Sequence, residues 1–469
     1  MTQKPKLMLF SHVSHKRSIT GAEKLLLHFC QEMRPYFSCV LVVPSEGMIS
    51  LLARKNGIRV KIQPFDLLHN MYTPYNGIRY EADQLMKTSS SRNVINLIRK
   101  ESPQMVLTNT CVNAVPAMAA RILNIPVIWK ITETIQMNDS TAEAVQIIDD
   151  FSDWVIGISQ TVLEPLQHGS IPEKSTILCP TWDASHAPRQ QWNLLRAKRR
   201  SHLGLTSKHF CVGYISTFIY GAKGLKSFIR SALTLCERYP HTRYWIIGNP
   251  ADEAYYHECL SLISKSGYSH QFLFTPFLVE VSEAYCAMDL TVVPSVVKEG
   301  FGMTALESLY YATPVVAFGQ GGLQEMMMAV GSPHLLVEPG NEADLALKME
   351  NCIQNPKESR LTGERCKVEV ERVYGPAAYS ARAAEMVQEL MNRLSLPERV
   401  RTHTKHKSAG SKKIWRRRRK KVAGRRKKKF VARKHSLRKS QSSLVKRLKK
   451  KKGVRKRLEL KRTRSKKKK

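Results

Sequence analysis

Short apolar runs alternate with segments of helical periodicity along the first 400 residues. Residues 6–11 suit a short buried strand, and Leu25, Leu26 and Phe29 then recur at helical spacing within 21–33. Further strands are predicted at 39–43, 105–108, 127–131 and 154–158, with a helix at 115–123. A strand followed by a helix, repeated several times, is typical of a parallel sheet with helices packed on its faces.

The same alternation begins again after residue 205. Strands are expected at 210–215, 244–247, 272–274, 290–293, 315–318 and 335–337, with helices at 226–238, 255–266 and 304–311. Segment 183–205 has little periodicity, so we interpret it as a hinge. The expected fold class is therefore α/β, with two Rossmann-like, doubly wound domains facing a cleft where the carboxyl ends of both sheets can meet one ligand.

The positive charge of the chain is concentrated in its last segment. Of 76 Lys and Arg, 36 lie within 401–469, together with a single acid, Glu459. The 40 basic and 37 acidic residues that remain leave the first 400 residues nearly neutral, although the chain has a formal charge of +38. So dense a run of like charge cannot fold alone, and residues 397–469 are predicted to be a disordered polybasic tail that orders only against a polyanion.

Several classes of protein are excluded by composition. No apolar run approaches the roughly 18 residues of a membrane span, and the apolar segment 7–10 is too short for a signal peptide. The ten cysteines are scattered singly without a C-x-x-C pair, which favours neither a disulfide framework nor a zinc site. We expect a soluble, cytoplasmic protein.

The segment 294–326 is the most informative for chemistry. Seven residues separate Glu299 from Glu307, and Gly300 and Gly302 form a flexible turn between them that leads into a helix. Glycines allow close approach of a ligand to the backbone, and free amides at a helix amino end attract anions. Carboxylates nearby can accept hydrogen bonds from sugar hydroxyls, so the pattern suits a sugar phosphate. A glutamate pair of this spacing is otherwise a common solvated surface feature.

This segment resembles the E-x7-E motif of glycosyltransferase family 4 (glycosyl transferases group 1), retaining enzymes of GT-B fold that use nucleotide-diphosphate sugars. The resemblance continues in family order over most of residues 5–395. Its other parts are SITGAEKLLLHF, IPVIWKITE and DWVIGISQTV, then the Lys223–Gly224 pair, YWIIGNP, FTPF and GGLQE at 321–325. It implies an N-terminal acceptor domain at 1–182, a hinge at 183–205, a donor domain at 206–370 and a helix at 371–396 that returns to the first domain.

The resemblance also implies roles for individual residues. Glu299 would hold hydroxyls of the donor sugar, and Lys223 would neutralise the leaving diphosphate, which makes these two the expected catalytic residues. The expected donor-binding residues are Gly21, Gly300, Phe301, Gly302, Met303 and Glu307, the last through the ribose. Glu23 and Glu133 are assigned to the acceptor or the cleft, although Glu23 can equally complement a helix dipole and Gly21 can simply shape a turn.

Two departures from the family pattern bear on activity. Tyr214 stands where an arginine usually shares the phosphate charge, and Thr132 stands near the place of a common cleft histidine, beside Lys130. The chain has no Asp-x-Asp pair, which agrees with neutralisation of the phosphates by lysine and helix amides. We therefore predict no essential metal and no cofactor besides the nucleotide-sugar donor.

Two functions remain open from the sequence. The first is a retaining hexosyltransferase-type enzyme acting on a glycan, lipid-linked or protein acceptor, held by residues 401–469 at an anionic membrane surface or envelope polymer. It would be cytoplasmic and peripheral at the inner face of the membrane. The second is a catalytically inactive scaffold that binds nucleic acid or another polyanion through the tail. Each basic residue near an anionic membrane contributes about 1 kcal/mol, and the few aromatics of the tail argue against base stacking.

Overall fold

Two parallel sheets organise the chain, whose computed structural model describes residues 4–182, 187–278 and 280–393. The first sheet has seven strands in the order β3-β2-β1-β4-β5-β6-β7. Their bounds are β1 Lys6–Phe10, β2 Ser38–Val43, β3 Arg59–Ile62, β4 Met105–Asn109, β5 Val127–Ile131, β6 Trp154–Gly157 and β7 Ser175–Ile177. The central strands β1, β4 and β5 are almost wholly buried, which explains their nearly unbroken apolar sequences.

Helices connect the strands of the first sheet and cover both of its faces. They are α1 Gly21–Met33, α2 Met48–Lys55, α3 Ile78–Met86, α4 Ser89–Glu101, α5 Ala114–Ile122, α6 Thr141–Phe151 and α7 Gln160–Leu163. Helix α1 begins at the residue expected from its apolar spacing, and the Thr20 hydroxyl accepts from the Glu23 amide to cap it. The apolar side of α1, including Leu26 and Phe29, packs on one face of the sheet.

The second sheet has six parallel strands in the order β10-β9-β8-β11-β12-β13. Their bounds are β8 Phe210–Ile219, β9 Thr242–Pro250, β10 Phe272–Thr275, β11 Leu290–Val293, β12 Val315–Phe318 and β13 Leu336–Val337. The helices of this half are α9 Leu225–Cys236, α10 Glu253–Lys265, α11 Ser282–Ala287, α12 Met303–Tyr310, α13 Gly321–Ala329, α14 Glu342–Gln354 and α15 Pro356–Tyr374. The prediction of two Rossmann-like α/β domains is confirmed.

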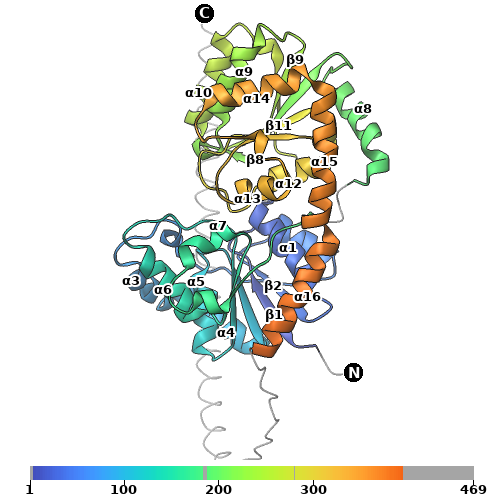
Figure 1. Cartoon of the computed structure of the whole chain (residues 1–469). Helices are drawn as coiled ribbons and strands as arrows, with labels where there is room; N and C mark the ends of the chain where they lie inside the picture. The colour runs from blue at the N-terminus through green and yellow to red at the C-terminus, as the bar shows by residue number, and fades with distance from the viewer. Residues whose placement is uncertain (1–3, 183–186, 279, 394–469) are drawn as a thin grey trace, which may run out of the picture. The chain divides into compact units, whose positions relative to one another are not determined.

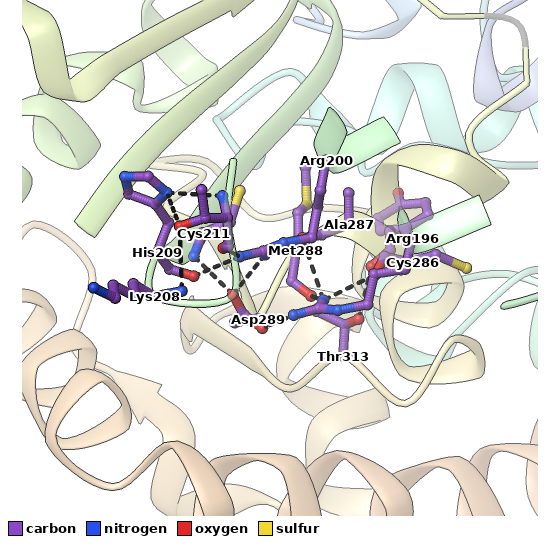
Figure 2. A network of polar contacts seen from close by, with 12 residues as sticks. Arg196, Arg200, Lys208, His209, Cys211, Cys286, Ala287, Met288, Asp289 and Thr313 are labelled. Carbon is purple, nitrogen blue, oxygen red and sulfur yellow. Dashed lines mark hydrogen bonds and ion pairs between the residues drawn. The ribbon is translucent and has the colours of Figure 1, made fainter. Parts of the chain in front are cut away.

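Part of the segment expected to be a hinge is a helix, α8, at Trp192–His202. Figure 2 shows how two arginines on one side of α8 fasten it to the second half. Arg196 donates to the carbonyls of Cys286 and Met288 at 3.0 Å each, and both Arg196 and Arg200 pair with Asp289. Helix α8 therefore belongs to the second half, and four residues of the expected hinge, 183–186, lie outside the described residues.

The C-terminal helical segment is divided in two at Gly375, whereas a single helix was expected at 371–396. Helix α15 ends at Tyr374 and α16 spans Pro376–Arg393. Pro376 begins the second helix at a position where a missing amide hydrogen costs nothing. Figure 1 shows α16 beside α1 and the first sheet, where Tyr379, Met386 and Leu390 join the core of that half.

No helix in the described ranges is long and apolar enough to cross a membrane. The predicted tail, residues 397–469, lies outside the described residues, so its predicted disorder stays a prediction.

Candidate active site

A cavity of about 480 Å³ lies between the two halves and is lined by residues of both. In the second sheet, β8 and β11 are neighbours. The chain continues from β8 toward one edge of the sheet, through β9, and from β11 toward the other edge, through β12, so the carboxyl ends of β8 and β11 form a topological switch point. The segment after β8 carries Lys223, and the segment after β11 carries Ser295 and Glu299. All three residues line the cavity.

Lys223 and Glu299 form an ion pair at the switch point. The Lys223 Nζ atom lies 2.8 Å from Glu299 Oε1, and the Ser295 hydroxyl donates to the same oxygen at 2.5 Å. Burial alone would raise the pKa of Glu299, but the Lys223 ammonium and the Ser295 hydroxyl hold it below its usual value. Burial likewise opposes the charge of Lys223, whereas Glu299 raises the pKa of its ammonium. Both groups are therefore charged near neutral pH.

The backbone brings Lys223 to this position through a close contact between two strand ends. Gly224, which follows the short helix Gly221–Lys223, has a φ of +69°, and a Cβ atom there would collide with the Pro294 carbonyl oxygen. Only glycine suits both conditions. Tyr214, the residue in place of the expected arginine, is buried in β8 and donates from its hydroxyl to the Lys223 carbonyl at 3.2 Å. It therefore supports the lysine loop without supplying charge.

The turn between the two glutamates is shaped by packing on both sides. Gly302 has a φ of +97° and caps α12, which begins at Met303, one residue before the predicted range of 304–311. Gly300 lies against the first half: the Ser159 hydroxyl donates to its carbonyl at 2.6 Å, and a Cβ atom on it would collide with the Thr132 carbonyl oxygen. The ring of Phe301 is buried and packs edge-to-face on Tyr374. The turn at 299–302 and the first residues of α12 line the cavity, where the free amides of a helix amino end favour an anion.

Glu307 lies on the buried side of α12, one turn beyond its start. The Tyr285 hydroxyl donates to Glu307 Oε2 at 2.9 Å, which fixes the carboxylate within the cavity wall. From the opposite half, Lys24 Nζ lies 3.8 Å from Glu307 Oε1. The two glutamates of the motif therefore both line one cavity.

The first half contributes Gly21 and Glu133 to the same cavity. A Cβ atom on Gly21 would meet nothing within 4 Å, so the protein's own packing does not require glycine there. The Glu133 carboxylate accepts from the Cys111 amide and the Thr132 hydroxyl, both at 2.6 Å. It is thus a fixed hydrogen-bond acceptor at the carboxyl end of β5.

Glu23 does not line the cavity. Its carboxylate accepts from the Thr20 amide at 2.8 Å and the Thr20 hydroxyl at 2.9 Å, and Glu23 is fully buried in the first turn of α1. Burial raises the pKa of Glu23, partly offset by these hydrogen bonds. Of the two roles that the sequence allowed, the structure shows the helix-terminal one, which fixes the shape of the segment bearing Gly21.

The sequence prediction omitted Ser295, Tyr285 and Lys24. Ser295 and Lys24 are each close in sequence to a predicted site residue, but their contacts depend on how strand ends meet. Lys130, in β5, is buried close to Glu133, and burial lowers the pKa of its amine to about 7, against the opposing effect of Glu133. Among the described residues, no group of three or more His, Cys, Asp or Glu side chains is arranged to hold a metal ion.

The part of the chain that carries this site is similar to a known protein family. Residues 209–355 match the family Glycosyl transferases group 1. The matched part holds Lys223, the motif of the two glutamates and the whole of α12.

Curated relatives resemble the chain over part of their length. A 2-deoxystreptamine glucosyltransferase of Streptomyces kanamyceticus is 27% identical over 147 residues, which is 31% of this chain and 36% of the relative. A D-inositol 3-phosphate glycosyltransferase of Corynebacterium aurimucosum is 27% identical over 231 residues, 47% of this chain and 52% of the relative. The chain thus matches about a third to a half of the length of these relatives.

Solved structures share the fold over a larger region. HepE of Anabaena, solved in complex with UDP and glucose, has a TM-score of 0.68 at 19% identity and covers 82% of this chain and 99% of its own. The same protein solved with UDP-glucose gives the same TM-score. WaaG, described as a glycosyltransferase of lipopolysaccharide biosynthesis, has a TM-score of 0.60 at 14% identity. At such identities the likeness establishes the GT-B fold.

Proposed function

We propose that the protein is a retaining glycosyltransferase of family 4 that moves a sugar from a nucleotide-diphosphate sugar to a hydroxyl acceptor. The observation that carries this proposal is the arrangement of Lys223, Glu299 and Ser295 at one switch point, beside the amino end of α12. A cation and free helix amides attract a diphosphate, and an adjacent carboxylate binds sugar hydroxyls. The family match and the UDP complexes of structural neighbours support the same class of donor.

The donor site is assigned from the cavity residues. The amides of 300–303 and the Lys223 ammonium bind the diphosphate, Glu299 binds hydroxyls of the transferred sugar, and Glu307 binds the ribose. Gly21 provides open space for the donor on the opposite wall. Tyr285 holds the Glu307 carboxylate in place by its hydrogen bond. Glu133, which is fixed by two short hydrogen bonds, receives a hydroxyl of the acceptor.

Transfer with retention places the leaving group and the acceptor on the same face of the sugar. The bond from the anomeric carbon to the diphosphate oxygen breaks as the bond to the acceptor oxygen forms. The acceptor proton passes to the departing diphosphate oxygen, so no protein base is required. Lys223 stabilises the charge that develops on this diphosphate, and a fixed donor of this kind contributes roughly 10²- to 10³-fold to the rate.

The acceptor is proposed to be a glycan, a lipid-linked sugar or a protein, as expected for an enzyme kept at a surface. The 36 basic residues of 401–469 would hold the enzyme at the anionic inner face of a membrane or at an envelope polymer. This attachment is electrostatic, so we expect it to weaken steeply as salt concentration rises.

The proposed activity is tested by incubating the full chain with a panel of nucleotide sugars and measuring the nucleotide diphosphate released. We expect release from at least one donor, and a loss of about 100-fold or more in Glu299→Gln. Glu101→Gln is the matched control, because Glu101 is also a buried, lysine-paired carboxylate but lies outside the cavity.

The result that would reject the proposal is the absence of binding and turnover with every donor. The inactive scaffold that binds a polyanion through the tail would then account better for the chain. Equal losses in Glu299→Gln and Glu101→Gln would also count against the site, since they would indicate a general effect of removing a buried charge.

A further inference from the structure

The charged residues that line the cavity balance one another. Three lysines, at 24, 223 and 298, face three glutamates, at 133, 299 and 307. A nucleotide-diphosphate sugar adds about two negative charges to this neutral lining. Because Lys223 is already held by Glu299 at 2.8 Å, one lysine and the amides of α12 leave part of that charge without a cation.

Lys24 differs from the other two lining lysines in how it is paired. Lys223 lies within hydrogen-bond distance of Glu299, and Lys298 lies 3.3 Å from Glu164 on the outer surface, with more than half of its side chain exposed. Lys24 lies 3.8 Å from Glu307, which is beyond hydrogen-bond distance. Within the described lining, Lys24 is therefore the cation most easily redirected.

The position of Lys24 on α1 is not explained by helix stability. It occupies the first turn of the helix, where the macrodipole disfavours a positive charge. The helix start is fixed by the capping contacts of Thr20 and Glu23, so the base of the Lys24 side chain is held in place. Its side chain is 30% exposed, and its four-carbon stem allows the ammonium to move within the cavity.

Gly21 lies one turn before Lys24 and borders the open space of the cavity. A donor that fills this space and places its ribose hydroxyls on Glu307 competes with Lys24 for Glu307 Oε1. The displaced ammonium remains within reach of the phosphates, because the diphosphate connects the ribose at Glu307 with the sugar at Glu299.

We propose that Lys24 is a phosphate-binding residue of the donor site, which leaves Glu307 when the ribose binds and neutralises the diphosphate together with Lys223. The inference rests on the proposed function. It assigns to the N-terminal half a direct part in recognising the donor, and it makes donor binding depend on closure of the two halves around one ligand.

Calorimetry with UDP, ADP and GDP, each compared with its monophosphate, tests this role. The variants are Lys24→Met, which keeps the length of the side chain, and Lys24→Arg, which keeps its charge. Lys6→Met is the matched control, because Lys6 is 28% exposed and 3.6 Å from Glu101, at the opposite end of β1 from the cavity. We expect Lys24→Met to weaken diphosphate binding about tenfold or more, as for loss of a charged hydrogen bond. The monophosphate should weaken several-fold less, and Lys24→Arg should recover most of the affinity.

Two other results overturn the inference while leaving the proposed function intact. If Lys24→Met weakens monophosphate and diphosphate equally, the residue acts on the shape of the loop and not on phosphate charge. If the variant binds both more tightly, Lys24 only competes with the ribose for Glu307. Failure of the unaltered protein to bind any diphosphate would instead reject the proposed function, and the role of Lys24 with it.

Discussion

The ion pair between Lys223 and Glu299 allows the stability of a buried carboxylate to be measured with and without its cationic partner. Replacing Lys223 with methionine removes the ammonium and keeps a side chain of similar length. Glu299 would then keep the Ser295 hydroxyl but lose the cation 2.8 Å away. The carboxylate is 15% exposed, so water replaces the lost partner only in part.

The expected cost follows from leaving a charge buried without its partner. Breaking a buried ion pair by removing one member destabilises proteins by about 3 to 5 kcal/mol, and the partial exposure of both side chains places this pair at about 3 kcal/mol. A loss of this size lowers the melting temperature of a domain of 150 to 250 residues by roughly 6 to 12 °C. The double variant Lys223→Met/Glu299→Gln should recover part of the loss, with a coupling energy of about 1 to 3 kcal/mol.

The effect should depend on pH in a defined direction. In the unaltered protein the pKa of Glu299 is lowered, so the pair adds stability above the unfolded pKa of a glutamate and loses it as pH falls through the lower folded value. In Lys223→Met the dominant remaining influence is burial, which raises the pKa of Glu299. The two proteins should therefore differ most near pH 7 and become more similar as pH falls toward the ordinary pKa of a glutamate, because burial without the lysine favours the protonated form of Glu299.

Thermal unfolding from pH 4 to pH 8, together with donor turnover at pH 7, provides the assay. A melting temperature of Lys223→Met that is lower by the same amount at every pH would refute the reasoning, because the loss would then not come from an ionised Glu299. An unchanged melting temperature with lost turnover would show that the pair contributes to catalysis without stabilising the fold.

Three further predictions follow from the cavity and from the tail. Gly21→Ala should leave the melting temperature unchanged, because its Cβ atom meets nothing within 4 Å, but weaken donor binding measured by calorimetry about tenfold; a fall in melting temperature would contradict this. Gly300→Ala should lower kcat/KM about 100-fold, since its Cβ atom displaces the Thr132 carbonyl and misplaces the two halves; normal kinetics would show that the contact is not needed. Deletion of 401–469 should preserve donor affinity but abolish sedimentation with anionic vesicles at low salt, and retained sedimentation would reject the tail as the anchor.

The sequence predicted the fold well wherever strands were apolar and helices had one apolar face. The bounds of β5, β11 and β12 agree with the predicted ranges, since each is buried on both sides. Strand β3 was missed because its sequence RVKI alternates charge with apolar residues at the sheet edge. The segment 183–205, predicted to be a hinge because it has little periodicity, contains α8, whose arginines bind carbonyls and Asp289.

The candidate site was predictable in part for a physical reason. Glu299, Gly300, Gly302 and Glu307 lie in one continuous segment, so their spacing carries information about a shared ligand. The contact between Lys24 of α1 and Glu307 of α12 joins the two halves of the chain, and no local pattern encodes it. Glu23 is different, because the Thr20-x-x-Glu23 spacing is that of a capping box, a local pattern that already indicates its role at the start of α1.

The topology of the two sheets explains why one cavity collects so many polar groups. In the first sheet the order reverses between β1 and β4, so the segments that follow these strands diverge and leave a gap at their carboxyl ends. Thr110, directly after β4, has a φ of +80°, a conformation that β-branched residues rarely adopt. Two hydrogen bonds of 2.8 Å hold Thr110 in this conformation. Its amide donates to the Lys130 carbonyl, and the Trp129 indole donates to the Thr110 carbonyl.

This strained backbone places the next amide, that of Cys111, on the Glu133 carboxylate. Conformations of this kind cost about 1 to 3 kcal/mol and persist where the surrounding structure imposes them, often at binding sites. In the first half, a strained backbone at Thr110 therefore fixes the Glu133 carboxylate at the cavity. In the second half, Gly224 and Gly302 allow the segments after the strands to approach one another closely. The carboxyl ends of both sheets therefore face one cavity, and a ligand bound there would contact acidic and basic side chains from both halves.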